Sequence, residues 1–257
     1  MFNKLRGLPP IIESKLAFPL YGIIGGVVLI VYGLVGRARA RGRANLPLNP
    51  AASRADAGRQ VVMGKAHSPS PLNSPVSNTA CVFYLEKTQA LKYARYGQNG
   101  RQESRGGRLV EAFGGFFVRY GTRTAFVVPF AGSADLCKPE TTKGFVDGIQ
   151  KFEQIIKEGE DVTVIGTPRP LADFMAYLRR DAGISLPSDS IADLTRMEKD
   201  PGYSGMPCFY ADGLESVTDQ PYNDYLARTA SSGLAYVLAG AVITAASAAA
   251  LVYFNGR

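Results

Sequence analysis

Cysteine, histidine and tryptophan are scarce in this sequence. Its 257 residues include three cysteines (Cys81, Cys137 and Cys208), one histidine (His67) and no tryptophan. Three cysteines cannot form a disulfide framework, and four possible ligands cannot fill the eight positions of a double zinc site. Neither a C-x-x-C nor an H-x-x-x-H pattern occurs. We therefore expect no metal site.

Motifs for nucleotide binding and catalysis are also missing. The sequence contains no G-x-x-x-x-G-K-(S/T), and no G-x-G-x-x-G follows a predicted strand. Cys81 and His67 form the one possible pair of a thiol and an activating imidazole. Cys81 lies inside a predicted strand, where a small buried residue is expected. The acids of residues 158–161 are typical of a solvated turn. We expect no cofactor, no small-molecule substrate and no catalytic centre, and keep Cys81 as the alternative nucleophile.

Positive charge is concentrated in the first quarter of the chain. Up to Lys65 there are ten basic and two acidic residues, and the 19 basic and 20 acidic residues that follow nearly cancel. The formal net charge of +7 therefore does not describe a basic domain. Nucleic-acid binding would need lysine and arginine spread over a folded face. We expect no nucleic-acid partner.

Two long runs carry no charged side chain: residues 16–36, with 21 residues, and residues 229–254, with 26. At a rise of about 1.5 Å per residue, each is long enough to cross a hydrocarbon core of roughly 30 Å. The first run is too long for the apolar region of a signal peptide, and arginines follow it instead of a cleavage site. We predict two transmembrane helices, with short tails at residues 1–15 and 255–257.

Small residues and arginines mark these spans. Gly22 and Gly26 in the first span, with Ala235 and Ala239 in the second, are predicted to let the two helices pack closely. Residues 37–58 read as a basic juxtamembrane linker. Its first four arginines are expected to contact anionic lipid headgroups: Arg37, Arg39, Arg41 and Arg43. They also place the segment between the spans on the positive side of the membrane, which is the bacterial cytoplasm or the mitochondrial matrix.

The segment at residues 59–228 is predicted to be a β-rich domain. Alternating β-branched and aromatic residues predict strands at residues 59–66, 80–89, 161–166 and 206–213, and a hairpin formed by residues 115–121 and 124–130. Apolar spacing predicts one amphipathic helix at residues 171–183, and a polar helix is expected before the second span. Residues 93–107 show the least structural signal.

The order of motifs between the spans resembles that of the GIDE family of membrane proteins. In that family a segment containing P-L-x-S-P and C-V-x-Y precedes a hairpin with a G-T-x-x-A-x-V turn, an E-G-(D/E)-x-V-x-V-x-G strand and a second membrane helix. The matching residues are Gly64, Pro71, Leu72, Ser74, Pro75, Cys81, Val82, Tyr84, Gly121, Thr122, Ala125, Val127, Pro129, Glu158, Gly159, Val162, Val164, Gly166, Pro207, Ala211, Asp212 and Gly213.

The resemblance implies an α+β protein whose β-rich domain is inserted between two transmembrane helices and contacts partners. Family members that are mitochondrial or plastid ubiquitin ligases carry a RING zinc module after the second span. Such a module needs eight ligands, so ligase activity does not transfer to a sequence with four cysteines and histidines.

We therefore expect a non-catalytic scaffold or accessory subunit that binds other membrane protein subunits. The expected location is the mitochondrial inner membrane, or another organellar or bacterial membrane. The alternative is a membrane-anchoring and target-binding component of a ubiquitin-type ligase whose RING is supplied by a partner.

Overall fold

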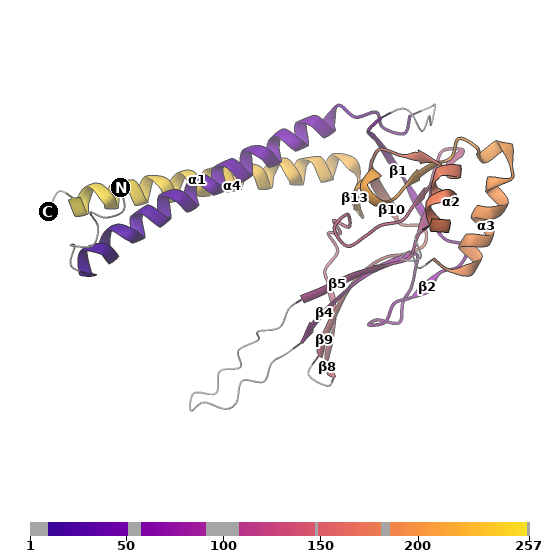
Figure 1. Cartoon of the computed structure of the whole chain (residues 1–257), viewed down its shortest axis with the longest axis horizontal. Coiled ribbons are helices and arrows are strands. Elements are labelled where there is room, and N and C mark those ends of the chain that lie inside the picture. Colours follow the sequence, from indigo (N-terminus) through magenta and orange to yellow (C-terminus); the bar gives the residue numbers. More distant parts are fainter. Residues whose placement is uncertain (1–9, 51–57, 91–107, 147–148, 181–185, 256–257) are drawn as a thin grey trace. The chain divides into compact units, whose positions relative to one another are not determined.

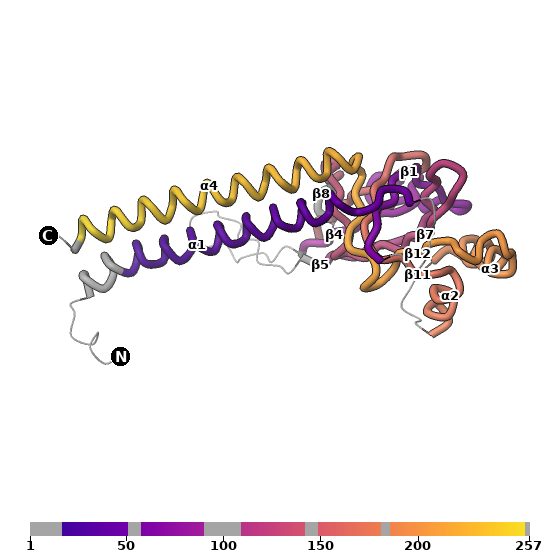
Figure 2. Tube along the Cα trace, turned by 90° about the horizontal axis from the view of Figure 1, so that it is seen from above, coloured from indigo at the N-terminus to yellow at the C-terminus, as the bar shows by residue number. Residues whose placement is uncertain are grey.

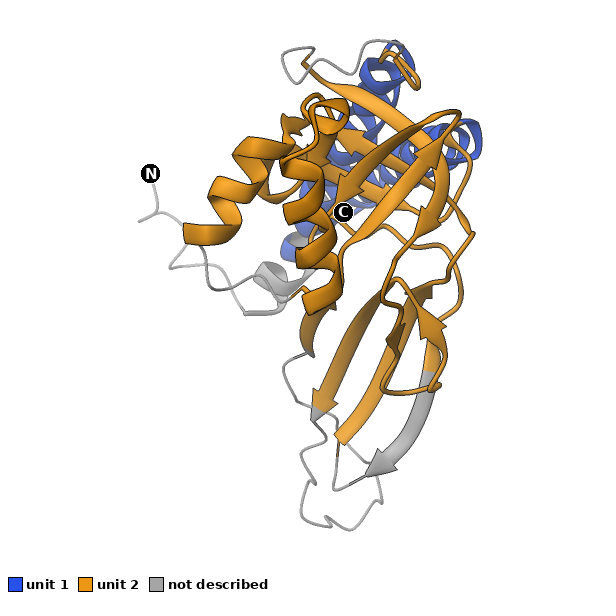
Figure 3. Ribbon diagram, turned by 90° about the vertical axis from the view of Figure 1, so that its right-hand side faces the viewer, with its two compact units in different colours: residues 1–45, 223–257 blue, residues 46–222 orange. Residues whose placement is uncertain are grey.

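The computed structural model describes residues 10–50, 58–90, 108–146, 149–180 and 186–255. The chain divides into two compact units (Figure 3). One unit contains residues 1–45 and 223–257, and the other contains residues 46–222. The fold is α+β. Along the sequence, one long helix precedes a β-rich region that contains sheets and shorter helices, and a second long helix follows it.

The first unit consists of two long helices, α1 (Pro10–Ala44) and α4 (Tyr222–Asn255). Ala17–Ala44 and Tyr222–Phe254 are long and apolar enough to cross a membrane. Only 17% and 6% of the residues in their most apolar windows are buried. A core helix of a soluble protein would be mostly buried, so this low burial favours the predicted spans.

The boundaries of the two helices differ from those expected. Helix α1 continues to Ala44, so residues 37–44 are helical and not part of a linker. Helix α4 begins at Tyr222, and the second unit ends at the same residue instead of at residue 228. The reason is that helix geometry tolerates the polar residues flanking each apolar run, whereas the sequence limits were set by charge alone.

The second unit is built on a seven-stranded sheet with the order β11-β12-β7-β6-β1-β10-β13. Its strands are β1 (Gln60–His67), β6 (Phe116–Tyr120), β7 (Arg123–Val127), β10 (Asp161–Gly166), β11 (Arg169–Pro170), β12 (Pro207–Phe209) and β13 (Leu214–Thr218). All neighbours are antiparallel except β12 and β7, which are parallel.

A four-stranded antiparallel sheet, with the order β5-β4-β9-β8, belongs to the same unit (Figure 1). Its strands are β4 (Phe83–Ala90), β5 (Arg108–Phe113), β8 (Thr141–Val146) and β9 (Ile149–Ile156). Two short strands, β2 (Leu72–Asn73) and β3 (Ala80–Cys81), pair with each other beside it.

The predicted hairpin is confirmed. Tyr120 pairs with Arg123, which leaves Gly121 and Thr122 as a two-residue turn between β6 and β7. Gly121 has φ +58°, a value that glycine adopts without a steric cost. The hairpin is thereby closed in the register that buries Phe116 and Val127, which pair with each other on its inner face.

Two apolar cores hold the second unit together. The larger core combines residues of the seven-stranded sheet, such as Phe116 and Val164, with residues of the four-stranded sheet, such as Phe83. The smaller core packs helices α2 (Leu171–Arg180) and α3 (Ser188–Glu198) against β6, β7 and β12, with Phe174 at its centre. The predicted amphipathic helix is confirmed as α2. Its expected last residue, Gly183, and residues 93–107 lie outside the described residues.

Several elements were not expected from the sequence: the strands β2, β5, β8, β9, β11 (Arg169–Pro170) and β13, and the helix α3. Strand β9 has the polar residues Glu153 and Gln154 at buried positions, so it shows no apolar alternation. Helix α3 buries only Ser190 and Leu194. Strand β13 occupies the first part of the segment where a polar helix was predicted, and the predicted helix is present at residues 222–228 as the first turns of α4.

Candidate functional site

Glycines line the approach of α1 to α4, which run antiparallel (Figure 2). A Cβ atom added at Gly33 would lie 2.5 Å from the carbonyl oxygen of Gly233 and 2.9 Å from the nitrogen of Val237. A Cβ at Gly26 would lie 2.7 Å from the carbonyl oxygen of Gly240. Backbone atoms cannot move aside as a flexible side chain can, so the two helices approach this closely only because these positions lack a Cβ.

The predicted packing positions divide between the two helices. Gly22 and Gly26 lie at the approach, where added Cβ atoms would meet the side chains of Ser247 and Thr244. Ala235 and Ala239 are exposed, so their predicted role in packing against α1 is wrong.

The reason is the register of α4. Its contacts with α1 recur at Gly233, Val237, Gly240, Thr244 and Ser247, with spacings of three and four. At about 100° per residue, Ala235 and Ala239 fall on the opposite side of α4. The alanine content of α4 is high on every face, so sequence spacing alone did not identify the contacting one.

Two threonine hydroxyl groups in α4 are satisfied inside the helix. The Thr244 hydroxyl donates to the carbonyl oxygen of Gly240 at 2.8 Å, and the Thr229 hydroxyl donates to that of Tyr225 at 2.8 Å. Tyr32 and Tyr236 pack edge to face across the two helices, with ring centroids 5.2 Å apart. Satisfied polar groups and close backbone contact are the conditions for helix packing within a lipid bilayer.

Five arginines of the helix pair gather at one end. The Arg43 guanidinium donates to the Tyr225 hydroxyl, and its central carbon lies 5.5 Å from the centre of the Tyr225 ring. The central carbon of the Arg228 guanidinium lies 5.7 Å from the same ring centre. Arg37 lies beside Gly233, while Arg39 and Arg41 are exposed. The four expected arginines therefore lie together with a fifth, Arg228, which precedes the second uncharged run and was not among the expected lipid contacts.

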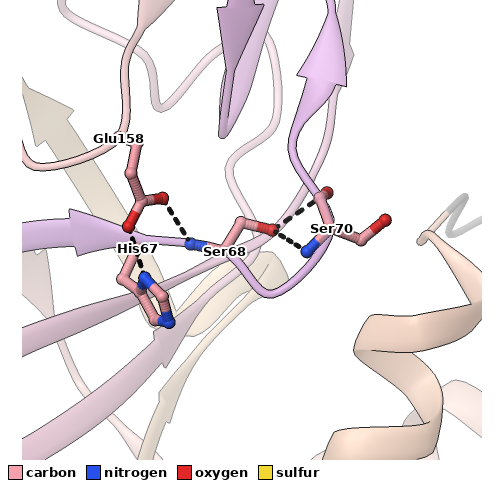
Figure 4. A network of polar contacts seen from close by, with 4 residues as sticks. All are labelled: His67, Ser68, Ser70 and Glu158. Atoms are coloured by element: carbon pink, nitrogen blue, oxygen red, sulfur yellow. Dashed lines mark hydrogen bonds and ion pairs between the residues drawn. The ribbon is translucent and has the colours of Figure 1, made fainter.

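His67, one member of the possible catalytic pair, is paired with an acid. His67 pairs through Nδ1 with Oε1 of Glu158, and Oε2 of Glu158 accepts a hydrogen bond of 2.9 Å from the Ser68 nitrogen (Figure 4). Burial, with the nearby charge of Glu153, raises the pKa of the Cys81 thiol to about 11. A thiol with such a pKa is protonated at neutral pH and is a poor nucleophile.

The other two cysteines give no stronger case for catalysis. Cys208 is buried, and burial raises the pKa of its thiol. Cys137 is half-buried, and its backbone nitrogen donates to Asp219 at 2.7 Å. Among the described residues, no group of three or more histidine, cysteine, aspartate or glutamate side chains is placed to hold a metal ion.

Glu153 is a buried carboxylate that sequence analysis missed. Its side chain accepts hydrogen bonds from the Ser74 hydroxyl at 3.0 Å, the Val76 nitrogen at 2.8 Å and the Ser77 nitrogen at 2.9 Å. Three donors compensate for the loss of water around the buried charge. The contacts hold the turn at residues 74–77 against β9, so Ser74 of the P-L-x-S-P segment has a structural role. Nothing in the sequence indicated this contact, because Glu153 is a single acidic residue in β9, a strand that was not predicted.

No family model matches the sequence, and neither the curated proteins nor the solved structures contain a match to it.

Proposed function

We propose that the chain is a two-span integral membrane protein that serves as a non-catalytic scaffold or accessory subunit of a larger membrane complex. The observation that carries this proposal is the use of the two faces of α4. One face packs closely against α1 through Gly233 and Gly240. The opposite face exposes Ala235, Ala239 and Ala246. Small residues on a lipid-facing surface allow the close approach of another membrane helix.

The properties of the second unit support a binding role over catalysis. Cys81 is fully buried, and the raised pKa of its thiol disfavours the thiolate that nucleophilic catalysis needs. The His67 imidazole pairs with Glu158. We therefore propose that the second unit, whose motifs resemble those of the GIDE family, contacts partner subunits. The arginine-rich end of the helix pair is proposed to lie on the positive side of the membrane, which is a mitochondrial inner membrane or another organellar or bacterial membrane.

The test is the native mass of the complex extracted in a mild detergent, with identification of the proteins that co-purify. The proposal predicts a mass well above the 27.6 kDa of the chain, with other integral membrane proteins present. Doubly substituted A235L/A239L should lose these partners while retaining its own fold. The matched control is A241L/A245L, which places the same bulk at exposed positions on a different side of α4.

Three results would contradict the proposal or redirect it. A bare monomer in every mild detergent would refute an accessory-subunit role. Equal partner loss in both double variants would show that the face of Ala235 and Ala239 does not hold the partner. Recovery of a RING protein or a ubiquitin-conjugating enzyme as the main partner would favour the ligase-component alternative.

A further inference from the structure

Five arginines and one acid occupy one end of the helix pair. In the last two turns of α1 and the first two turns of α4 the acid is Asp224, and the arginines are Arg37, Arg39, Arg41, Arg43 and Arg228. Arg37 directly follows the first uncharged run, and Arg228 directly precedes the second. The contact between Arg43 and Tyr225 joins these two segments. Charge of one sign is thus concentrated at the predicted membrane boundary.

The spacing of the arginines along α1 matches the depth of a headgroup layer. At about 1.5 Å per residue, Arg37 and Arg43 are separated by about 9 Å along the helix axis. The headgroup region on each side of a bilayer is roughly 5–8 Å thick, given about 30 Å of hydrocarbon within a total of 40–45 Å. The arginines therefore span the layer in which lipid phosphates lie.

Two arginines are held in place and two are exposed. Arg43 and Arg228 both lie over the Tyr225 ring, which lowers the conformational entropy that they would lose on binding an anion. Arg39 and Arg41 make no ion pair with any described residue, and their side chains are exposed. Arg39 and Arg43 are four residues apart, so they lie on the same side of α1, whereas Arg41, two residues from Arg39, lies on the other side and would meet the headgroup of a different lipid.

We propose that this end of the helix pair binds the phosphodiester groups of anionic phospholipids, with Arg43 and Arg228 fixed on Tyr225 and Arg39 and Arg41 as exposed contacts. Guanidinium groups bind phosphate oxygens through two parallel hydrogen bonds, which favours arginine over lysine at such sites. The inference requires only that the helices span a membrane. It does not depend on the proposed assembly with other subunits.

The test uses the full chain in a mild detergent, titrated with phosphatidylglycerol and, separately, with phosphatidylcholine. Native mass spectrometry counts the bound lipids. The test variant is R39Q/R41Q. The matched control is R119Q/R180Q, which removes two exposed arginines from the second unit and changes the net charge equally. A third arm adds inorganic phosphate as a competitor.

We expect phosphatidylglycerol to bind more tightly than phosphatidylcholine. At about fivefold per arginine, R39Q/R41Q should weaken phosphatidylglycerol binding by about fivefold on each side of α1, whereas R119Q/R180Q should change it by less than about twofold. Equal weakening by both double variants, or no preference for the anionic lipid, would overturn the proposal. Displacement of the lipid by inorganic phosphate at equal concentration would assign the site to free phosphate instead. A monomeric protein that still shows the expected lipid binding would contradict the assembly role alone.

Discussion

Replacing Gly33 by alanine should force α1 and α4 apart. The added Cβ would lie 2.5 Å from the carbonyl oxygen of Gly233, 2.8 Å from Cγ2 of Val237 and 2.9 Å from the nitrogen of Val237. Carbon atoms in contact prefer separations of about 3.5–4.0 Å, so the helices must separate locally by about 1 Å. Overpacking of this kind costs about 1–3 kcal/mol.

The matched control is Gly25→Ala. A Cβ at Gly25 meets no atom within 4 Å, although Gly25 lies in the same helix. Alanine is favoured over glycine by about 1 kcal/mol inside a helix, and both variants receive this benefit. The difference between G33A and G25A therefore isolates the contact with α4. We expect G33A to be less stable than G25A by about 1–3 kcal/mol.

A fluorescent reporter can follow the helix pair alone. The native chain has no tryptophan, so a Tyr236→Trp background gives one signal, from the position that packs against Tyr32. Titration with a denaturing detergent, followed through this tryptophan, yields the free energy of separating the helices. If G33A and G25A unfold at the same detergent fraction, the two helices do not approach at Gly33 and the proposed packing is wrong.

Three further predictions concern the second unit. Glu153→Gln should lower the free energy of unfolding of the second unit by about 2–3 kcal/mol, because the carboxylate accepts three hydrogen bonds. The control is Glu111→Gln, at an exposed position, which should change this free energy by less than about 0.5 kcal/mol. Chemical denaturation measures both variants. In the native protein at pH 8, iodoacetamide should label half-buried Cys137 before Cys81, because the pKa of the Cys81 thiol is raised to about 11. Peptide mass spectrometry measures the two labelling rates. Faster labelling of Cys81 would restore it as a candidate nucleophile. Ala211 has φ +48°, so Ala211→Gly should raise the thermal midpoint slightly by removing backbone strain, and a lower midpoint would contradict this reasoning.

The sequence predicted the features that depend on local pattern. The two apolar helices follow from uncharged runs, and the β6–β7 hairpin follows from alternation around Gly121 and Thr122. Helix α2 follows from the spacing of Leu171, Phe174 and Met175, all of which are buried.

The features that were missed depend on contacts between distant segments. From the sequence, an acidic residue such as Glu153 is expected at the surface. Its burial and its hydrogen bonds come from the turn at residues 74–77, which is distant in the sequence. The contacting face of α4 is the one that carries Gly233 and Gly240. These two glycines are seven residues apart and therefore share a face, a signal that was overlooked among the many alanines. Arg228 lies 185 residues from Arg43 along the chain, and the antiparallel helix pair brings it into the basic end.

The most direct test of the central claim, that α1 and α4 both cross a membrane, is the accessibility of the two ends of the chain and of the second unit in sealed vesicles. Epitope tags at both ends and a protease site engineered in the turn at Gly121 and Thr122 report the two sides of the bilayer. We predict that the protein resists extraction by alkaline carbonate, and that both tags lie on one side while the protease site lies on the other. Tags on opposite sides, or release of the intact chain by carbonate, would contradict a two-span topology.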